Sequence, residues 1–341
     1  MLCPYKDDRT VMDLIEQFKQ RARTRPGVVV YPEAEDERIL RAASVVAADG
    51  FAKPVVLGQP EVITQRVKEL SVAWEGVAVV DPLGAGHLDR YAADYAVRRE
   101  GVTEATARRL IRKSVFYGAA MVAAGDAQAM VGGVMHSTAL IIQAAALLVG
   151  YAPGVTSASS FFIMVVPKCL GETNKLLIFA DCAVNIDPSA EQLADTAVAA
   201  GRNASALIGV EPHVAMLSFS TKGSAVHPLA DKVIEATRLA CEKAPDLLID
   251  GELQADAALV PTVAARKVKE SPVAGQANVL VFPDLDAANI AYKLTQYLGN
   301  AKAYGPVLQG FAKPVSDLSR GASVNDIIAA TAITLAQAIG A

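Results

Sequence analysis

The stretch that decides the fold is residues 127–142, AQAMVGGVMHSTALII. A short apolar run ends in two glycines, and a histidine and two hydroxyl residues separate it from an apolar helical pattern that begins at Ala139. This order predicts a buried strand, a loop and a helix. Because the same alternation runs along the preceding residues, we expect an α/β protein with parallel strands and helices on both faces of the sheet. The earlier patterns predict helices at 10–24, 35–50, 89–100 and 103–124 and strands at 28–33, 53–58 and 76–82.

The length of 341 residues favours two domains rather than one. The pattern changes after Pro153, where two apolar runs at 159–167 and 175–185 are joined by only a short connection and predict a hairpin. These patterns place one domain boundary near 145–155 and another near 300. The later patterns predict helices at 189–202, 228–244, 285–299 and 324–340 and strands at 213–220, 246–253 and 278–284.

Composition and charge exclude several classes of protein. The chain is 52% hydrophobic and carries a net charge of -4, without a run of Lys or Arg. Proteins that bind nucleic acid or a membrane surface concentrate positive charge, so we expect neither partner. The most apolar stretch, 139–155, is interrupted by Gln143, Gly150 and Pro153. A membrane span needs ~20 mostly apolar residues, so this stretch predicts a buried helix.

Cysteine and histidine spacing gives no sign of a disulfide frame or a metal site. The four cysteines contain no CxxC pair, which fits reduced thiols in a cytoplasmic protein. The four histidines are far apart, so we expect no metal. A strand leads into Gly84-Ala85-Gly86, but Asp89 stands where a nicotinamide motif needs its third glycine. The cysteines are Cys3, Cys169, Cys182 and Cys241, and the histidines are His87, His136, His213 and His227.

His136, Ser137 and Thr138 allow two interpretations. Hydroxyls at a helix start can cap free backbone N–H groups, which is a structural role. A helix N-terminus with nearby glycines is also typical of an anion site. Parallel α/β sheets bind ligands at the C-terminal ends of their strands, which is where this loop falls. Both interpretations stay open on these residues alone.

The stretch SDLSRGASVND at 316–326 is a second candidate for chemistry. Ser323 predicts a helix cap, and Asp326 at the third helical position predicts a capping box with Asp in place of Glu. That structural account leaves Ser319 and Arg320 unexplained. An arginine beside a hydroxyl, just ahead of a helix, suits a phosphate or a developing oxyanion.

Collinear stretches from about residue 12 to the C-terminus match one known family. They are YPEAEDERILRAA, GDAQAMVGGVMHST, FFIM followed by Pro167, LIFADCAVNIDPSAEQLA, VAMLSFSTKGSA, DGELQADAAL, ANVLVFPDLDAANIAYKL and GPVLQGFAKPVSDLSRG. On these stretches the chain resembles the phosphate acetyltransferases (phosphotransacetylases) in their short single-module form. So many matches in order are far more specific than any single motif above.

The resemblance implies a reaction and an architecture. Such enzymes reversibly convert acetyl-CoA and phosphate into acetyl phosphate and CoA, by direct thiol attack in a ternary complex. The substrates are small molecules, with coenzyme A as a substrate rather than a bound cofactor, and no metal is needed. The implied fold is two α/β domains with an interdomain cleft, similar to the isocitrate and isopropylmalate dehydrogenases. Domain I would hold 1–148 and 303–341; domain II, 149–302, would form a homodimer.

The resemblance also implies roles for single residues. Asp326 is expected to take the proton from the CoA thiol, Ser319 to position that thiol, and Arg320 to hold the phosphate and stabilise charge on the acyl oxygen. Other residues are expected only to bind. The acyl phosphate pocket would use Tyr304, Arg98, Gln143 and the loop of His136, Ser137 and Thr138, and CoA would contact Phe282, Pro283, Asp284 and Asn289.

Three positions depart from the family pattern. Members commonly carry Asp, Arg and Pro shortly after His-Ser-Thr, where this chain has Leu140, Gln143 and Ala144. A charged hydrogen bond to an anion contributes ~1.5–3 kcal/mol, so the missing arginine bears on phosphate affinity. Two alternatives follow: an acyltransferase for propionyl- or butyryl-CoA, and a non-catalytic acyl-CoA sensor. A dehydrogenase would rest on fold analogy alone.

Overall fold

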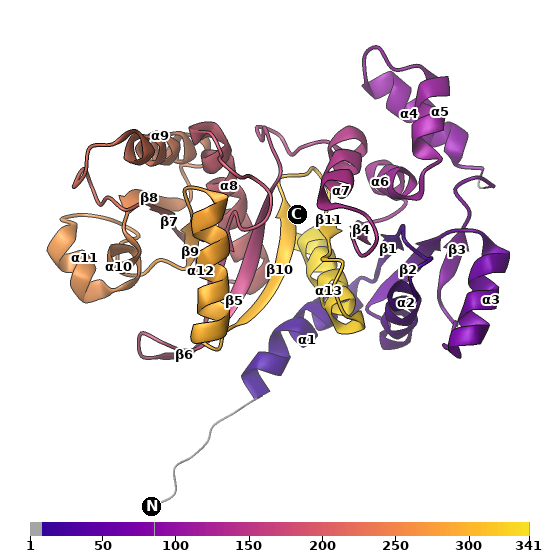
Figure 1. Ribbon diagram of the computed structural model, residues 1–341, viewed down its shortest axis with the longest axis horizontal. Coiled ribbons are helices and arrows are strands. Elements are labelled where there is room, and N and C mark those ends of the chain that lie inside the picture. The colour runs from indigo at the N-terminus through magenta and orange to yellow at the C-terminus, as the bar shows by residue number, and fades with distance from the viewer. Residues whose placement is uncertain (1–8, 85, 341) are drawn as a thin grey trace, which may run out of the picture. The chain divides into compact units, whose positions relative to one another are not determined.

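The computed structural model describes residues 9–84 and 86–340, which leaves Cys3 outside the described residues. The chain divides into two compact units (Figure 1). Unit I comprises Ile15–Pro153 and Phe311–Ala341, and unit II comprises Gly154–Gly310 with the start of α1 (Arg9–Thr24) up to Leu14. Both units are α/β, as the sequence predicted.

Unit I contains a five-stranded sheet in which every pairing is parallel. Its order is β11-β4-β1-β2-β3, so the last strand of the chain lies at one edge beside β4. Val29 and Val30 in β1 are fully buried, as expected for a parallel strand covered on both faces. The strands are β1 (Gly27–Tyr31), β2 (Ala52–Leu57), β3 (Ala78–Val80), β4 (Ala129–Gly132) and β11 (Val315–Asp317).

The predicted single helix at 103–124 is wrong. The chain breaks it at Lys113, whose backbone is extended, with φ -79° and ψ 132°. The helix before the break is amphipathic, whereas the helix after it is buried continuously from Val115 to Val122, so the chain has to turn between them. The helices of unit I are α1, α2 (Glu37–Asp49), α3 (Pro60–Leu70), α4 (Leu88–Arg98), α5 (Glu104–Ile111), α6 (Ser114–Ala124), α7 (Thr138–Ala144), which continues as a π-helical segment (Ala145–Val149), and α13 (Val324–Gly340).

Strand order in unit I singles out one place for a site. The chain builds β1, β2 and β3 in one direction and then adds β4 and β11 on the other side of β1. Open α/β sheets bind ligands outside the carboxyl ends of the strands where this reversal occurs. The loops that follow β1, β4 and β11 are therefore the ones to examine.

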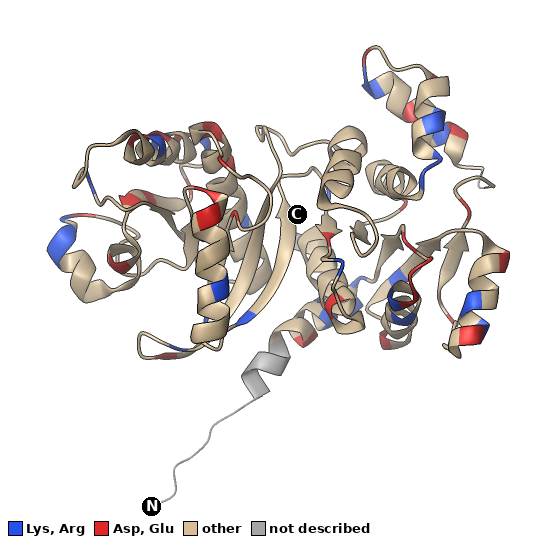
Figure 2. Ribbon diagram, in the orientation of Figure 1, with Lys and Arg blue, Asp and Glu red and all other residues tan. Residues whose placement is uncertain are grey.

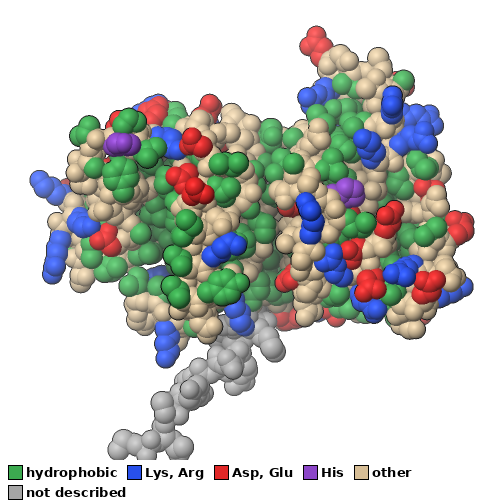
Figure 3. All heavy atoms as spheres, viewed as in Figure 1, with side chains coloured by type: hydrophobic (Ala, Val, Ile, Leu, Met, Phe, Trp, Pro, Cys, Tyr) green, Lys and Arg blue, Asp and Glu red, His purple; other side chains and the backbone are tan. Residues whose placement is uncertain are grey.

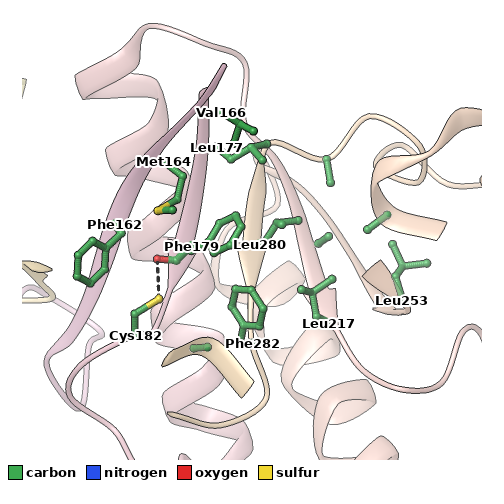
Figure 4. Close-up of a cluster of buried hydrophobic side chains, with 14 of the residues drawn as sticks. Phe162, Met164, Val166, Leu177, Phe179, Cys182, Leu217, Leu253, Leu280 and Phe282 are labelled. Carbon is green, nitrogen blue, oxygen red and sulfur yellow. Dashed lines mark hydrogen bonds between the residues drawn. The ribbon is translucent and has the colours of Figure 1, made fainter. Parts of the chain in front are cut away.

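Unit II contains a six-stranded mixed sheet of order β10-β5-β6-β9-β7-β8. The predicted hairpin is confirmed, because β5 pairs antiparallel with β6 along most of its length. A core of apolar side chains covers this sheet, with Phe179 packed against Phe282 at 5.2 Å between ring centroids (Figure 4). The strands are β5 (Ser159–Cys169), β6 (Glu172–Ala180), β7 (His213–Leu217), β8 (Leu248–Leu253), β9 (Val279–Val281) and β10 (Lys302–Gln309).

The helices of unit II follow its parallel strands. They are α8 (Ala190–Asn203), which continues as a π-helical segment (Ala204–Ile208), α9 (Pro228–Lys243), α10 (Ala255–Leu259), α11 (Pro261–Lys267) and α12 (Leu285–Leu298). The expected return of the chain to the first domain at residue 303 differs from this division. Lys302–Gln309 forms β10, which pairs antiparallel with β5, so the chain leaves this sheet only after Gly310.

The surface carries both signs of charge. Both Lys or Arg and Asp or Glu occur along helices such as α2 and α3 (Figure 2). Among the described residues, no helix combines the length and apolarity that crossing a membrane requires. Cys169, Cys182 and Cys241 are free thiols, and the Cys182 thiol donates to the Phe179 carbonyl at 3.4 Å (Figure 4).

Candidate active site

The His136 loop and the Ser319 loop lie side by side in unit I. They follow β4 and β11, which are adjacent parallel strands (Figure 1). The Leu318 N–H donates to the Gly132 carbonyl at 2.7 Å, and the Thr138 hydroxyl donates to Asp317 at 2.6 Å. The two loops that the sequence singled out are therefore neighbours along one sheet edge.

Gly133 makes this approach possible. Its φ is +111°, a conformation that other residues rarely adopt. A Cβ atom there would lie 2.4 Å from Asp317 Oδ1 and 2.6 Å from the Leu318 nitrogen. Any side chain would push the two loops apart, so this glycine serves close packing between them.

A buried carboxylate from a third loop holds the His136 loop. Glu33, just after β1, has a side chain with 0% exposure. Its Oε2 accepts the N–H groups of Gly133 and Val134 at 2.8 and 3.0 Å. Its Oε1 accepts the N–H groups of Met135 and His136 at 3.0 and 2.8 Å, and His136 Nδ1 lies 2.8 Å from the same oxygen.

These contacts partly decide between the two interpretations of His136, Ser137 and Thr138, which were a helix cap and an anion site. The N–H groups of residues 133–136 are occupied by Glu33, so they do not face a ligand. Ser137 caps α7 through the Leu140 N–H, as the structural interpretation predicted. The side chain of His136 is 35% exposed and stays available to an anion.

Arg38 connects the same segment to the tail loop. One guanidinium nitrogen, Nη1, donates to the carbonyls of Arg320 and Ala322, both at 2.8 Å. The guanidinium also pairs with Asp36, which lowers the pKa of that carboxyl group through their hydrogen bond. The segment after β1 therefore fixes both neighbouring loops, one through Glu33 in the turn and the other through Arg38 in the first turn of α2.

The tail loop presents its charged groups outward. The predicted capping box is confirmed: the Asp326 carboxylate accepts the Ser323 N–H at 2.8 Å, and the Asp326 N–H donates to the Ser323 hydroxyl at 3.2 Å. Ser319 and Arg320 are exposed, and the Ser319 hydroxyl accepts the Gly321 N–H at 3.2 Å. Within residues 9–84 and 86–340, the Arg320 guanidinium has no hydrogen-bond or ion-pair partner.

Asp317, at the end of β11, is a buried acid between the two loops. Its Oδ2 accepts the Thr138 hydroxyl, while its Oδ1 is buried without a partner among the described residues. Burial raises the pKa of Asp317 to about 6; the hydrogen bond from Thr138 opposes this shift, and the negative charge of Glu33 adds to it.

Gln143 lies on the helix that starts at Thr138, and Arg98 contacts the far end of that helix. Arg98, at the end of α4, donates to the Leu148 carbonyl at 3.3 Å. Leu148 is ten residues beyond Thr138, about 15 Å along a helix axis. Gln143 is exposed on α7. In this structure Arg98 is thus bound at the far end of the helix, not beside His136.

The remaining predicted residues belong to unit II. Tyr304 lies in β10 opposite Ile163, and burial raises the pKa of its hydroxyl. Phe282 is packed in the core, Asp284 caps α12 by accepting the Ala287 N–H at 2.8 Å, and Asn289 donates to the Cys182 carbonyl at 3.4 Å. The side chains of Phe282, Asp284 and Asn289 thus have structural partners, and Pro283 is half-buried.

A family model described as Phosphate acetyl/butaryl transferase matches residues 13–335. The chain belongs to this family. It is 47% identical over 329 residues to the phosphate acetyltransferase of Acetivibrio thermocellus, covering 96% of this chain and 98% of that one. It is 46% identical to the enzyme of the same name from Thermoanaerobacterium thermosaccharolyticum, covering 96% and 100%. The crystal structure of a phosphotransacetylase from Streptococcus pyogenes superposes with a TM-score of 0.90 at 41% identity, covering 97% and 100%.

Three residues of the phosphate acetyltransferase loops escaped sequence reasoning. Glu33, Arg38 and Asp317 hold the loops in place. Glu33 and Arg38 stand outside the two loop stretches weighed as candidates for chemistry, and Asp317 lies in the second of them but was given no role. A usable signal was present for the acids, because a carboxylate directly after a buried strand of a parallel sheet lies at the edge where ligands bind. Arg38 had no such signal, since its partners are backbone carbonyls far along the chain.

A groove of about 1010 Å³ opens beside His136 at the carboxyl ends of β1, β2 and β3. Its lining includes four acids besides Glu33, against two arginines: Glu35, Glu61, Glu69 and Asp81, with Arg66 and Arg112. That excess of negative charge makes the groove a poor place for the anionic substrates of this family. No group of three or more potential metal ligands is close enough for a metal ion among the described residues.

Replacing Asp317 by Asn tests the electrostatics between the loops. Because the folded pKa of about 6 is above the unfolded value of 3.8, the native carboxyl contributes stability below pH 4 that is lost as pH rises through 6. Asn cannot ionise, so the free energy of unfolding of Asp317→Asn minus that of the parent should rise by ~3 kcal/mol between pH 4 and pH 7. Denaturant titrations across this range measure the difference.

The control is Asp286→Asn, which changes an exposed aspartate on α12. Its difference from the parent should stay nearly constant over the same pH range. A constant difference for Asp317→Asn as well would contradict the raised pKa.

Proposed function

We propose that this protein is a phosphate acetyltransferase, which transfers an acetyl group reversibly between CoA and inorganic phosphate. The observation that carries the proposal is the tail loop, where Ser319, Arg320 and Asp326 are exposed together beside the His136 loop, and where the Arg320 guanidinium has no partner in the part of the chain that the structure describes. The names of the relatives, which match over nearly the whole chain, support the same reaction.

Each group has a task that suits its chemistry. CoA thiol attacks the carbonyl carbon of acetyl phosphate, Asp326 accepts the thiol proton, and phosphate leaves with the electrons of the broken C–O bond. Ser319 orients the thiol by hydrogen bonding. Arg320 binds the phosphate oxygens and stabilises the negative charge on the acyl oxygen, for which an unpaired guanidinium is well suited. His136 contacts the acyl phosphate from the neighbouring loop.

Proton removal is best concerted with attack. An ordinary carboxylate and an ordinary thiol differ by about 4.6 pKa units, so full transfer before attack would cost ~6 kcal/mol. A base that takes the proton while the sulfur–carbon bond forms avoids that cost. A thiolate therefore does not have to accumulate at this site.

The first test is release of CoA thiol from acetyl-CoA and phosphate by the purified protein. Asp326→Asn keeps the shape of the capping box but loses the base, so kcat should fall by ~10²–10⁴. The matched control is Ser323→Ala, which weakens the same helix cap. It should cost about 1 kcal/mol of stability. Because it removes one hydrogen bond to Asp326 and keeps the carboxylate, it should lower kcat far less than Asp326→Asn does.

Two results would count against the proposal. One is thiol release by the folded parent protein no faster than background. The other is an equal loss of kcat in both variants, which would assign Asp326 to the helix cap alone.

Phosphate binding gives a second prediction, at Gln143. We propose that this residue, where the family commonly has arginine, faces the anionic substrate. Gln143→Arg should then lower KM for phosphate by roughly 10- to 150-fold, equivalent to ~1.5–3 kcal/mol, with KM for acetyl-CoA little changed. Steady-state kinetics with each substrate varied in turn measures both constants. An unchanged phosphate KM would remove Gln143 from the site.

The CoA side is proposed for unit II. We assign CoA contacts to Phe282, Pro283, Asp284 and Asn289. Because the side chains of Phe282, Asp284 and Asn289 already have partners, the contacts are proposed to come from Pro283 and from the backbone of this segment. Tyr304 of β10 is proposed to contact the acyl group, whereas the position of Arg98 at the far end of the helix gives it no such role. CoA acts as a substrate, and a cytoplasmic location fits the free thiols of Cys169, Cys182 and Cys241.

We further propose that the protein is a homodimer formed through unit II. One face of α12 exposes four large apolar side chains, and Figure 3 shows hydrophobic side chains among charged ones on the face where α12 lies. Such a row of apolar groups is typical of a protein interface. The four are Ile290, Leu294, Tyr297 and Leu298, with exposures of 58%, 52%, 80% and 82%.

Charge introduced into this row should break the dimer. Leu294→Glu combined with Tyr297→Glu should convert the protein to monomer, because two carboxylates would have to be buried in an apolar contact. Sedimentation velocity measures the mass, with Asp286→Asn at the polar start of α12 as the control. A mass unchanged by the double substitution would exclude this face.

A further inference from the structure

The backbone of the His136 loop binds the Glu33 carboxylate in the way that other proteins bind an external anion. Four consecutive backbone N–H groups, those of residues 133–136, converge on its carboxylate, two on each oxygen. Consecutive N–H groups that converge in this way form the concave anion sites that many proteins offer to phosphate. Here the anion is internal, and it reaches the loop from the turn just after the neighbouring strand β1.

The fifth contact links this anion to the exposed site. His136 Nδ1 lies 2.8 Å from Glu33 Oε1. Because a carboxylate only accepts hydrogen bonds, Nδ1 has to carry the proton, and Nε2 is the nitrogen left for a ligand. The same oxygen also accepts the His136 N–H at 2.8 Å, so backbone and ring are fixed by one atom.

We propose that Glu33 is a positioning residue for acyl transfer: its carboxylate fills the anion nest of residues 133–136 and sets the tautomer and direction of the His136 ring. The inference rests on the proposed function for its kinetic consequence. Glu33 itself is buried and does not touch substrate. It acts through His136, which is partly exposed, and through the loop that lies against Asp317.

Removal of the Glu33 carboxylate should leave a small cavity whose lining groups are known. Glu33→Ala deletes the Cγ atom and the carboxylate, which together have the shape of an acetate ion. The hole is lined by four N–H groups and an imidazole. We expect kcat for thiol release to fall by about 100-fold, the loss that a small misplacement of a reacting group can cause. KM should change much less.

Added acetate should then restore most of the lost kcat in a saturable way. Acetamide has the same shape but no charge, and it should restore little. The parent enzyme supplies the baseline for any inhibition by either compound. Asp195→Ala is the matched control, since it removes another buried carboxylate, one that accepts the Thr156 N–H at 2.7 Å in unit II. It should lower stability while kcat stays unchanged, with no response to acetate.

Two outcomes would overturn the inference. If folded Glu33→Ala keeps kcat within about twofold of the parent, the carboxylate does not position the site. If kcat falls but acetate restores no more than acetamide does, the side chain supports the loop by packing and not as an anion.

A spectroscopic measurement separates this inference from the proposed reaction. Nitrogen-15 NMR of histidine-labelled protein reports which ring nitrogen of His136 carries the proton, and His136→Gln identifies its signals among those of the four histidines. We expect the proton on Nδ1 in the parent, its loss from Nδ1 in Glu33→Ala, and its return with acetate. A tautomer that does not change between parent and Glu33→Ala would overturn the inference. If the parent releases no thiol, the proposed function is what fails, and the tautomer still decides the role of Glu33.

Discussion

A buried carboxylate on which five N–H donors converge is the interaction on which the site depends. Moving a carboxylate out of water costs several kcal/mol unless it is well hydrogen-bonded, and Glu33 meets that condition only if the loop of residues 133–136 keeps its present course. The cost of burial thus enforces the shape of the loop. Arg38, in the first turn of the helix α2 that follows, holds the tail loop. The positions of both loops therefore depend on the segment that follows β1, a strand in the middle of the sheet.

Strand order explains how distant parts of the sequence share one site. β11 joins the sheet beside β4 although nearly two hundred residues separate them, and this places Asp317 against Thr138 and Gly133. Unit I therefore contains the His136 loop, the tail loop and the segment that holds them. The chemistry proposed for the tail is supported by contacts within a single compact unit.

Several residues have a structural and a proposed chemical role at once. Asp326 closes a capping box with Ser323, yet it stays exposed at the helix start. Its position on a regular helix fixes the carboxylate better than a free loop would. Ser137 likewise caps α7 while its neighbour His136 faces outward. A structural partner for a side chain does not exclude a chemical role, provided that part of the group remains accessible.

The sequence by itself determined the local features. Alternating apolar runs predicted the parallel sheet of unit I, the short connection near Gly171 predicted the β5–β6 hairpin, and the spacing of Ser323 and Asp326 predicted the capping box, because each depends on residues close along the chain. It did not predict the break at Lys113, which arises because α6 has to be buried on all sides. Only the tertiary structure decided that Glu33 occupies the N–H groups of the His136 loop, that Arg38 holds the tail, and that β10 stays with the sheet of unit II. Those outcomes depend on which strands lie side by side, and the contacts that settle strand order join residues far apart in the sequence.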